Sequence, residues 1–208
     1  MNFEQNSGIV FVGEFPSVFI DERELFGGRV DRESSTRLRQ TLQCTFAGGQ
    51  HELSANTGQI SVTSLSNTTM PGDLIESAEL IATKIDALAP VVKISGIGFI
   101  NNGFIKQNVL GKRGADFCEE LFTEKVVRIA GGGKILSLCA ISYDIGAFRY
   151  NIRIEPYFAS EGDDLYFGAH GHQNFKSGDS LTDKLSNLQE FVEHMQEFLL
   201  RIVEEAVE

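Results

Sequence analysis

Residues 179–206, DSLTDKLSNLQEFVEHMQEFLLRIVEEA, decide the fold class of this chain. Apolar residues recur in this stretch at alternating spacings of four and three, which places them on one face of an α-helix. They are Leu181, Leu185, Leu188, Val192, Met195, Leu199, Ile202 and Ala206. Asp179 or Ser180 suits the N-cap of this helix. The stretch predicts one long amphipathic helix that packs against a sheet.

A second, shorter helix is expected from Gly72-Asp73 to just before Pro90, with Leu74, Ala78, Ile81, Ile85 and Leu88 on its apolar face. Alternation of apolar and polar residues over 37–46 and 148–155 predicts half-buried antiparallel strands ahead of each helix. Each half also opens alike, with an apolar strand (9–15 or 91–100) and then a short helical piece (21–26 or 114–121). We therefore predict an α+β protein of two related halves, 1–90 and 91–208. Each half is an antiparallel β-sheet packed by one long amphipathic helix, and together they form one compact unit.

Composition narrows the classes of partner. The 208 residues carry a net charge of −11, and no apolar run approaches the roughly 20 residues that span a bilayer. We expect no membrane partner, and nucleic-acid binding is disfavoured because phosphate contacts need clustered Lys and Arg. Specific nucleic-acid contact through the cluster Arg29, Arg32, Arg37 and Arg39 stays a weaker alternative. Three cysteines without a C-x-x-C pair, and an N-terminus without a secretory signal, predict a reduced, cytoplasmic location.

The segment Gly96-Ile97-Gly98-Phe99-Ile100-Asn101 resembles a mid-chain strand of Gly-x-Arg-Tyr-Ile-Asn type, found in a large uncharacterised bacterial protein family whose members end in a long helix. Gly96, Ile100 and Asn101 fit that strand, Phe99 stands for its aromatic residue, and Gly98 replaces its arginine. The resemblance implies no activity. It implies a bacterial protein, in some cases encoded near mobile elements and antiviral defence genes.

The pair His170 and His172 is the most chemical pattern in the chain. On a strand, residues i and i+2 point to the same side, so both imidazoles could reach one ligand or ion. A ligand site between the halves would draw on His170, His172, Arg149, Arg153 and Asn101. Spacing does not choose a third metal ligand among His51, Glu155 and Asp144, and two exposed polar residues on the outer face of a strand explain the histidines as well. We therefore predict no metal and no cofactor.

Catalytic motifs are not evident. Gly131-Gly132-Gly133-Lys134 lacks the spacing of a phosphate-binding loop and is better explained as a hairpin turn. Cys118 stands beside carboxylates that would raise its thiol pKa, and Cys139 lies in an apolar run typical of a core strand. No catalytic residue is predicted.

The last helix has more apolar surface than one sheet requires, because Phe191 and Phe198 lie beside its main stripe and Leu200 and Val203 widen it further. That surplus packs either against the first half of the same chain or against another subunit or partner. The predicted interface comprises Phe191, Met195, Phe198, Leu199 and Ile202. The preferred function is that of a non-enzymatic binding or assembly subunit, working by self-association or with a protein partner through its sheet faces and C-terminal helix. The alternative is a small-molecule- or metal-binding enzyme or receptor with its site near His170 and His172.

Overall fold

The computed structural model describes residues 4–16, 36–38, 41–46, 51–65, 71–87, 92–121, 138–176 and 179–207. The short helix expected at 21–26, the glycine turn at 131–134, and Arg29, Arg32 and Arg39 lie outside these residues. Arg37 lies on a described strand, at 36–38.

The described strands belong to one antiparallel sheet that includes strands of both predicted halves, whereas a separate sheet was predicted for each half. They are β1 (Glu4–Glu14), β2 (Thr36–Leu38), β3 (Thr41–Phe46), β4 (His51–Ala55), β5 (Gln59–Ser64), β6 (Lys93–Ile105), β7 (Cys139–Ile145), β8 (Phe148–Pro156) and β9 (Leu165–Asn174). Their hydrogen-bonded order is β2-β3-β4-β5-β1-β6-β9-β8-β7. The described helices are α2 (Pro71–Ala87), α3 (Gln107–Leu110), α4 (Gly114–Glu120), α6 (Leu181–Leu185) and α7 (Leu188–Val207), with a 3-10 turn, η3, at Phe158–Ser160. The α+β class is confirmed.

The chain divides into two compact units that interleave along the sequence. Unit 1 comprises Met1–Gln5, Asn101–His170 and Glu193–Glu208, and unit 2 comprises Asn6–Ile100 and Gly171–Val192. Strands β6 and β9 and helix α7 each contribute residues to both units. The predicted division into 1–90 and 91–208 is a different partition, and it stays a prediction.

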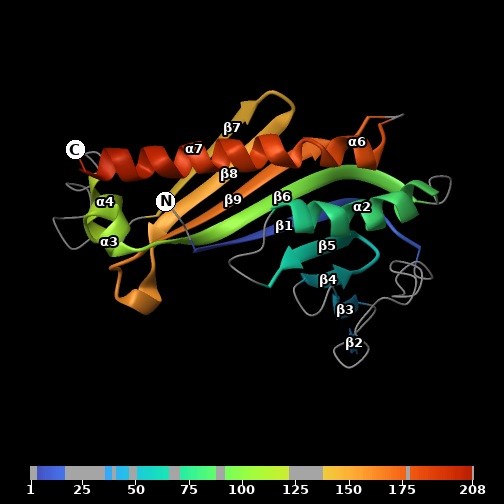
Figure 1. The fold of residues 1–208 in the computed structure, drawn as a ribbon, viewed down its shortest axis with the longest axis horizontal. Helices are drawn as coiled ribbons and strands as arrows, with labels where there is room; N and C mark the ends of the chain where they lie inside the picture. The colour runs from blue at the N-terminus through green and yellow to red at the C-terminus, as the bar shows by residue number, and fades with distance from the viewer. Residues whose placement is uncertain are drawn as a thin grey trace. The chain divides into compact units, whose positions relative to one another are not determined.

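Unit 2 holds the β2–β5 strands and helix α2 (Figure 1). Strand β5 pairs antiparallel with β1, with Ile9 opposite Val62 and Phe11 opposite Ile60, and all four side chains are fully buried. Helix α2 buries Leu74, Ala78, Ile81, Ala82 and Ile85. It begins with Pro71, whose missing N–H costs nothing in a first helical turn. The first four residues of the predicted apolar stripe are therefore buried, and Leu88 lies outside the described residues.

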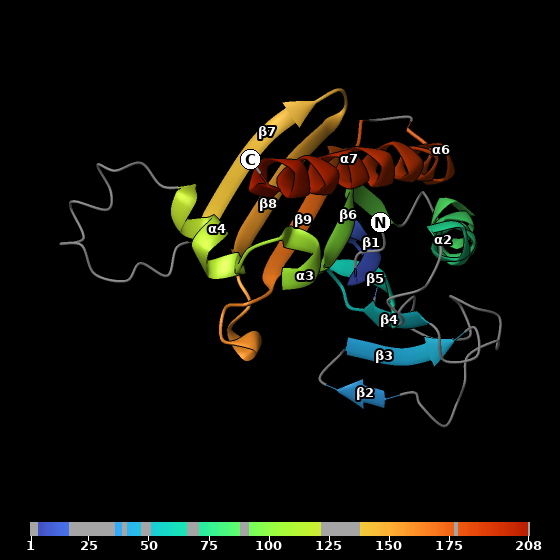
Figure 2. The ribbon, with the colours of Figure 1, turned by 60° about the vertical axis from the view of Figure 1, so that its left-hand side comes forward.

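Unit 1 holds β7, β8, the first part of β9 and the end of β6, with the C-terminal part of α7 crossing one face of these strands (Figures 1 and 2). Strand β8 buries every second residue from Phe148 to Ile154 and exposes Arg149, Asn151 and Arg153 between them. His194 of α7 contacts the buried side, where its Nε2 lies 2.8 Å from the Tyr143 hydroxyl and its ring packs on Tyr150. The helix therefore covers one face of this part of the sheet, which we call the inner face.

The predicted long helix is interrupted near its start. Residues 181–185 and 188–207 form separate helices, α6 and α7, joined by a turn at Ser186 and Asn187. Ser180 is the N-cap of α6, and its side chain accepts a hydrogen bond from the Asp183 N–H. All eight apolar residues of the predicted stripe are buried, so the two helices keep one continuous apolar side.

Candidate functional site

The face of the unit 1 sheet opposite α7 carries the side chains that remain open to a partner. We call it the outer face. On β8 it holds Arg149, Asn151, Arg153 and the half-buried Glu155, and on β9 it holds Tyr166, Gly168 and His170. On β6, Asn102 and Phe104 occupy the half-buried alternate positions of the same face.

Three aromatic rings form a cluster on the outer face. The Phe104 ring centroid lies 4.2 Å from that of Tyr157 and 5.6 Å from that of Tyr166. All three residues are only partly buried, and Phe158 next to them is 63% exposed. Aromatic rings are usually turned toward the core, so rings gathered on the solvent side of a sheet are a feature of binding surfaces.

Gly168 allows the neighbouring side chains to close over β9. A Cβ at this position would lie 3.0 Å from the Tyr166 hydroxyl oxygen and 3.1 Å from Asn102 Oδ1. The Tyr166 and Asn102 side chains therefore both approach the backbone at Gly168. The result is a strip of Asn102, Gly168, Tyr166 and Phe104 that presents a hydroxyl, an amide and aromatic edges together.

The arginines of the outer face are held by acidic neighbours. Arg149 donates two hydrogen bonds to the Asp144 carboxylate, at 2.9 Å and 3.3 Å, and Arg153 donates to Glu155 at 2.5 Å. The Arg149 guanidinium lowers the pKa of Asp144 by hydrogen bonding and by its charge. Because both arginine side chains are more than half exposed, these pairs orient the guanidinium groups and add little stability.

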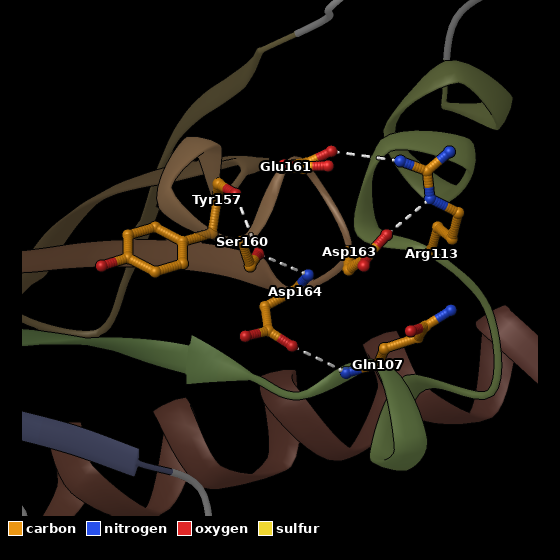
Figure 3. A network of polar contacts seen from close by, with 7 residues as sticks. All are labelled: Gln107, Arg113, Tyr157, Ser160, Glu161, Asp163 and Asp164. Atoms are coloured by element: carbon orange, nitrogen blue, oxygen red, sulfur yellow. Dashed lines mark hydrogen bonds and ion pairs between the residues drawn. The ribbon is translucent and has the colours of Figure 1, made fainter.

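A network of polar contacts fixes one end of the outer face (Figure 3). Arg113 Nε donates to Asp163 Oδ1 at 2.7 Å, and Arg113 Nη2 donates to the Glu161 carbonyl oxygen at 3.1 Å. Asp164 accepts hydrogen bonds from the Gln107 backbone N–H at 3.0 Å and from Lys106 Nζ at 3.2 Å. The connection between β8 and β9 is thereby tied to α3 and to the start of α4.

The connection itself is closed by local hydrogen bonds. The Ser160 hydroxyl donates to the Tyr157 carbonyl oxygen and accepts from the Asp164 N–H, both at 2.9 Å. The chain reverses through Glu161 and Gly162, which have φ values of 55° and 82°. Such left-handed backbone suits glycine at Gly162 and is an uncommon conformation for Glu161. These contacts hold Tyr157 where its ring meets Phe104.

The structure separates the residues predicted to form a ligand site. Arg149, Arg153 and His170 lie on the outer face, whereas Asn101 is 1% exposed and belongs to the inner, buried side of β6. The sheet backbone lies between Asn101 and the other three. His170 and His172 occupy alternate positions of β9 that are not buried, as predicted, but the first belongs to unit 1 and the second to unit 2.

His172 has a packing role in unit 2. A Cβ on Gly96 would lie 2.7 Å from His172 Cε1, so the imidazole covers this glycine, and His172 Nε2 lies 3.1 Å from Asn174 Oδ1. The proposed third ligands are engaged elsewhere: His51 is buried with its Nδ1 3.0 Å from the Ser77 hydroxyl, while Asp144 and Glu155 hold the arginines. Within the residues that the structure describes, no group of three or more His, Cys, Asp or Glu side chains is arranged to hold a metal ion.

The predicted interface on the last helix is placed mostly in the core. Phe191, Met195, Leu199 and Ile202 are at most 7% exposed, and the Phe191 ring packs on Phe99 at 5.7 Å. Their apolar side chains are covered by this chain's own residues, whereas Leu200, which also belongs to the predicted surplus, is 42% exposed. Phe198 keeps partial exposure.

The aromatic cluster was not anticipated from the sequence. Tyr166 carries a signal that could have revealed it, because it is an aromatic residue in the polar phase of β9, whereas the alternation of β6 does not mark the side of Phe104 as polar. The contact with Tyr157 could not have been found, because it depends on the turn after β8.

Comparison with known proteins assigns the chain to no group: no protein-family model and no curated protein matches it. The helices of the described part include none that is long and apolar enough to cross a membrane.

Proposed function

We propose that the protein is a non-enzymatic binding or assembly subunit that engages a protein partner through the outer face of unit 1. The aromatic cluster of Phe104, Tyr157 and Tyr166 carries this proposal. Aromatic side chains and arginine contribute most to protein–protein affinity, because they exclude water over a large area and still offer polar contacts. Arg153 and Arg149 lie on the same face, each already oriented by a carboxylate.

Because the apolar stripe of α7 is buried, we place the proposed binding surface on the sheet and not on the helix. The apolar stripe of the helix is used within the protein, whereas the outer face has no described helix over it (Figures 1 and 2). A polar face alone needs no partner, since antiparallel sheets often have one solvated side. A sheet face that is simply solvated does not explain why three aromatic rings cluster on it.

The cellular setting is part of the proposal. Cys118 and Cys139 are free thiols, in keeping with the predicted cytoplasmic location. A bacterial protein complex, in the defence- or mobile-element-associated context that the sequence resemblance implies, is the assembly we propose.

A two-residue variant tests the proposed function. Arg153→Glu together with Tyr166→Ser removes one ring and reverses one charge on the outer face. Glu197→Gln, on the exposed side of α7, is the matched control. In quantitative affinity purification from extracts of the native cell, at least one protein should lose about 30-fold or more of its recovery with the double variant only, the loss expected for contacts worth about 2 kcal/mol. If no recovered protein depends on the outer face, the proposal is wrong.

An internal duplication is the second part of the proposal. In the strand order, β1 pairs with β5, the last strand before α2, and β6 is next to β9, the last strand before α6 and α7. The first strand of each predicted half is thus adjacent to the last. An experimental structure in which β1, β4, β5 and α2 superpose on β6, β8, β9 and α7 with the same strand directions would support common origin, and opposed directions would contradict it.

A further inference from the structure

Strand β7 exposes a row of apolar side chains at the end of the strand order. Tyr143 lies opposite Tyr150 on β8, and Ile141 and Ile145 lie opposite Ile152 and Phe148, so all three β7 residues face the inner side. Yet Ile141 is 37% exposed and Ile145 is 43% exposed, while their partners on β8 are buried. Helix α7 reaches Tyr143 through His194 but leaves the two isoleucines open.

Within the described residues, β7 has one strand neighbour, β8. Its inner row, Cys139, Ile141, Tyr143 and Ile145, carries no charge, and the whole strand contains no lysine or proline. Natural edge strands are normally guarded by such residues, because an unguarded edge pairs with other strands. The one charge of β7, Asp144, is on the outer side and binds Arg149. An uncharged, half-exposed inner row on an edge without lysine or proline is the pattern that pairs with another strand.

The sequence of β7 fits a second copy of itself. Antiparallel pairing about Ser142 sets Ile141 opposite Tyr143 of the second copy, and Cys139 opposite its Ile145. On the outer side, Asp144 meets Ala140 and not another aspartate, and Asp144 already binds Arg149 of its own chain. No two like charges face each other in this register, which matters for a chain of net charge −11. A two-fold interface requires this kind of self-complementary patch.

We propose that β7 is a homodimerisation edge, at which two copies pair antiparallel about Ser142 and cover each other's Ile141 and Ile145. This inference goes beyond the proposed function and does not depend on it, because it uses the edge of the sheet and not the outer face. Pairing at this edge would continue the sheet from one copy to the next. The two outer faces would then lie on one extended surface, which would double the sites offered to a partner.

The oligomeric mass tests this inference. At about 100 µM chain, a concentration that populates dimers with small interfaces, sedimentation equilibrium should give twice the 22.9 kDa chain mass. Ile141→Lys with Ile145→Lys should weaken dimerisation at least about 100-fold, as charge is placed in the row. Leu200→Lys, at an α7 leucine that is 42% exposed, is the control and should stay dimeric.

A second variant keeps the test independent of folding losses in the lysine variant. Ser142→Cys in a Cys139→Ala background should form an intermolecular disulfide on mild oxidation, because Ser142 lies on the proposed two-fold axis. A monomeric wild-type chain at this concentration would overturn the proposal, as would covering of β7 by residues 122–137 of the same chain. A dimer that resists the lysines and does not cross-link at position 142 would overturn it as well. The outer-face variant Arg153→Glu/Tyr166→Ser should leave the dimer intact, so the two proposals fail separately.

Discussion

Gly114 offers a sharp test of how the polar network is built. It is the first residue of α4 and is buried against the connection between β8 and β9. A Cβ at this position would overlap the Asp164 carbonyl oxygen and lie 2.7 Å from the Asp164 carbonyl carbon and 2.9 Å from the Leu165 nitrogen. All of these are backbone atoms that cannot rotate away. Gly114→Ala therefore forces the helix and the connection apart.

The size of the loss follows from the contacts that separate. Carbon atoms pack at about 3.5–4.0 Å, so the two segments must move by about 1 Å. That movement breaks the hydrogen bonds from Gly114 N–H to the Asp163 carbonyl, at 2.8 Å, and from Ala115 N–H to the Gly162 carbonyl, at 2.9 Å. Each is worth about 0.5–1.5 kcal/mol, and overpacking adds about 1–3 kcal/mol. The higher helix propensity of alanine offsets up to about 1 kcal/mol of this loss in the free energy of unfolding. We expect the free energy of unfolding to fall by about 2–4 kcal/mol.

Urea unfolding followed by circular dichroism measures this loss. Gly98→Ala is the matched control, because the nearest atoms to its added Cβ are 3.7–3.8 Å away, an ordinary contact distance. The control should stay within about 0.5 kcal/mol of the wild type. If Gly114→Ala is as stable as Gly98→Ala, the close approach of α4 to the connection is wrong.

Two further predictions concern the core. Phe191→Ala should lower the free energy of unfolding by about 3–5 kcal/mol, because the buried Phe191 ring packs on Phe99. Phe198 is partly exposed, so Phe198→Ala should lower it by about 1 kcal/mol. Equal losses of the two variants in urea unfolding would contradict the burial of the helix stripe. Burial raises the pKa of the Cys118 thiol to about 12 from 9.0. The folded state therefore holds its proton more tightly, and the stability from this group is present below pH 9 and is lost as the pH rises from 9 toward 12. At pH 8, and at a chain concentration low enough to keep the protein monomeric, peptide mapping after alkylation should show Cys139 modified well before Cys118, and equal rates would contradict the burial of Cys118.

The secondary structure was accessible from the sequence for the last helix and for β8, but the long alternation over 37–46 was wrongly predicted as one strand. Leu38 pairs with Thr41, so this segment forms two antiparallel strands, β2 and β3. The stripe of α7 repeats over many turns, and β8 alternates without a fault, so both were predicted. Strand β4 was missed because its five residues, His51–Ala55, are a short run between glycine- and asparagine-containing segments, and its antiparallel pairing with β3 and β5 is not visible in the sequence. The turn at Ser186 and Asn187 was missed because the apolar spacing continues across it.

The candidate site could not be predicted from residue spacing, because it depends on contacts between residues that are far apart in the sequence. Arg113 and Asp163 are 50 residues apart in the sequence, and no local pattern joins them. The histidine pair drew attention because i and i+2 share a strand face, which is correct for β9. Asn101 was placed with them from sequence alone, and the alternation of β6 sends it to the opposite side of the sheet.

The affinity of the partner for the outer face tests the central claim most directly. Once a partner has been recovered, calorimetric titration of Arg153→Glu/Tyr166→Ser against the wild type measures what Tyr166 and Arg153 contribute. We predict a dissociation constant at least about 30-fold higher for the double variant and unchanged for Glu197→Gln. Equal affinities for the double variant and the wild type would show that the outer face does not bind the partner.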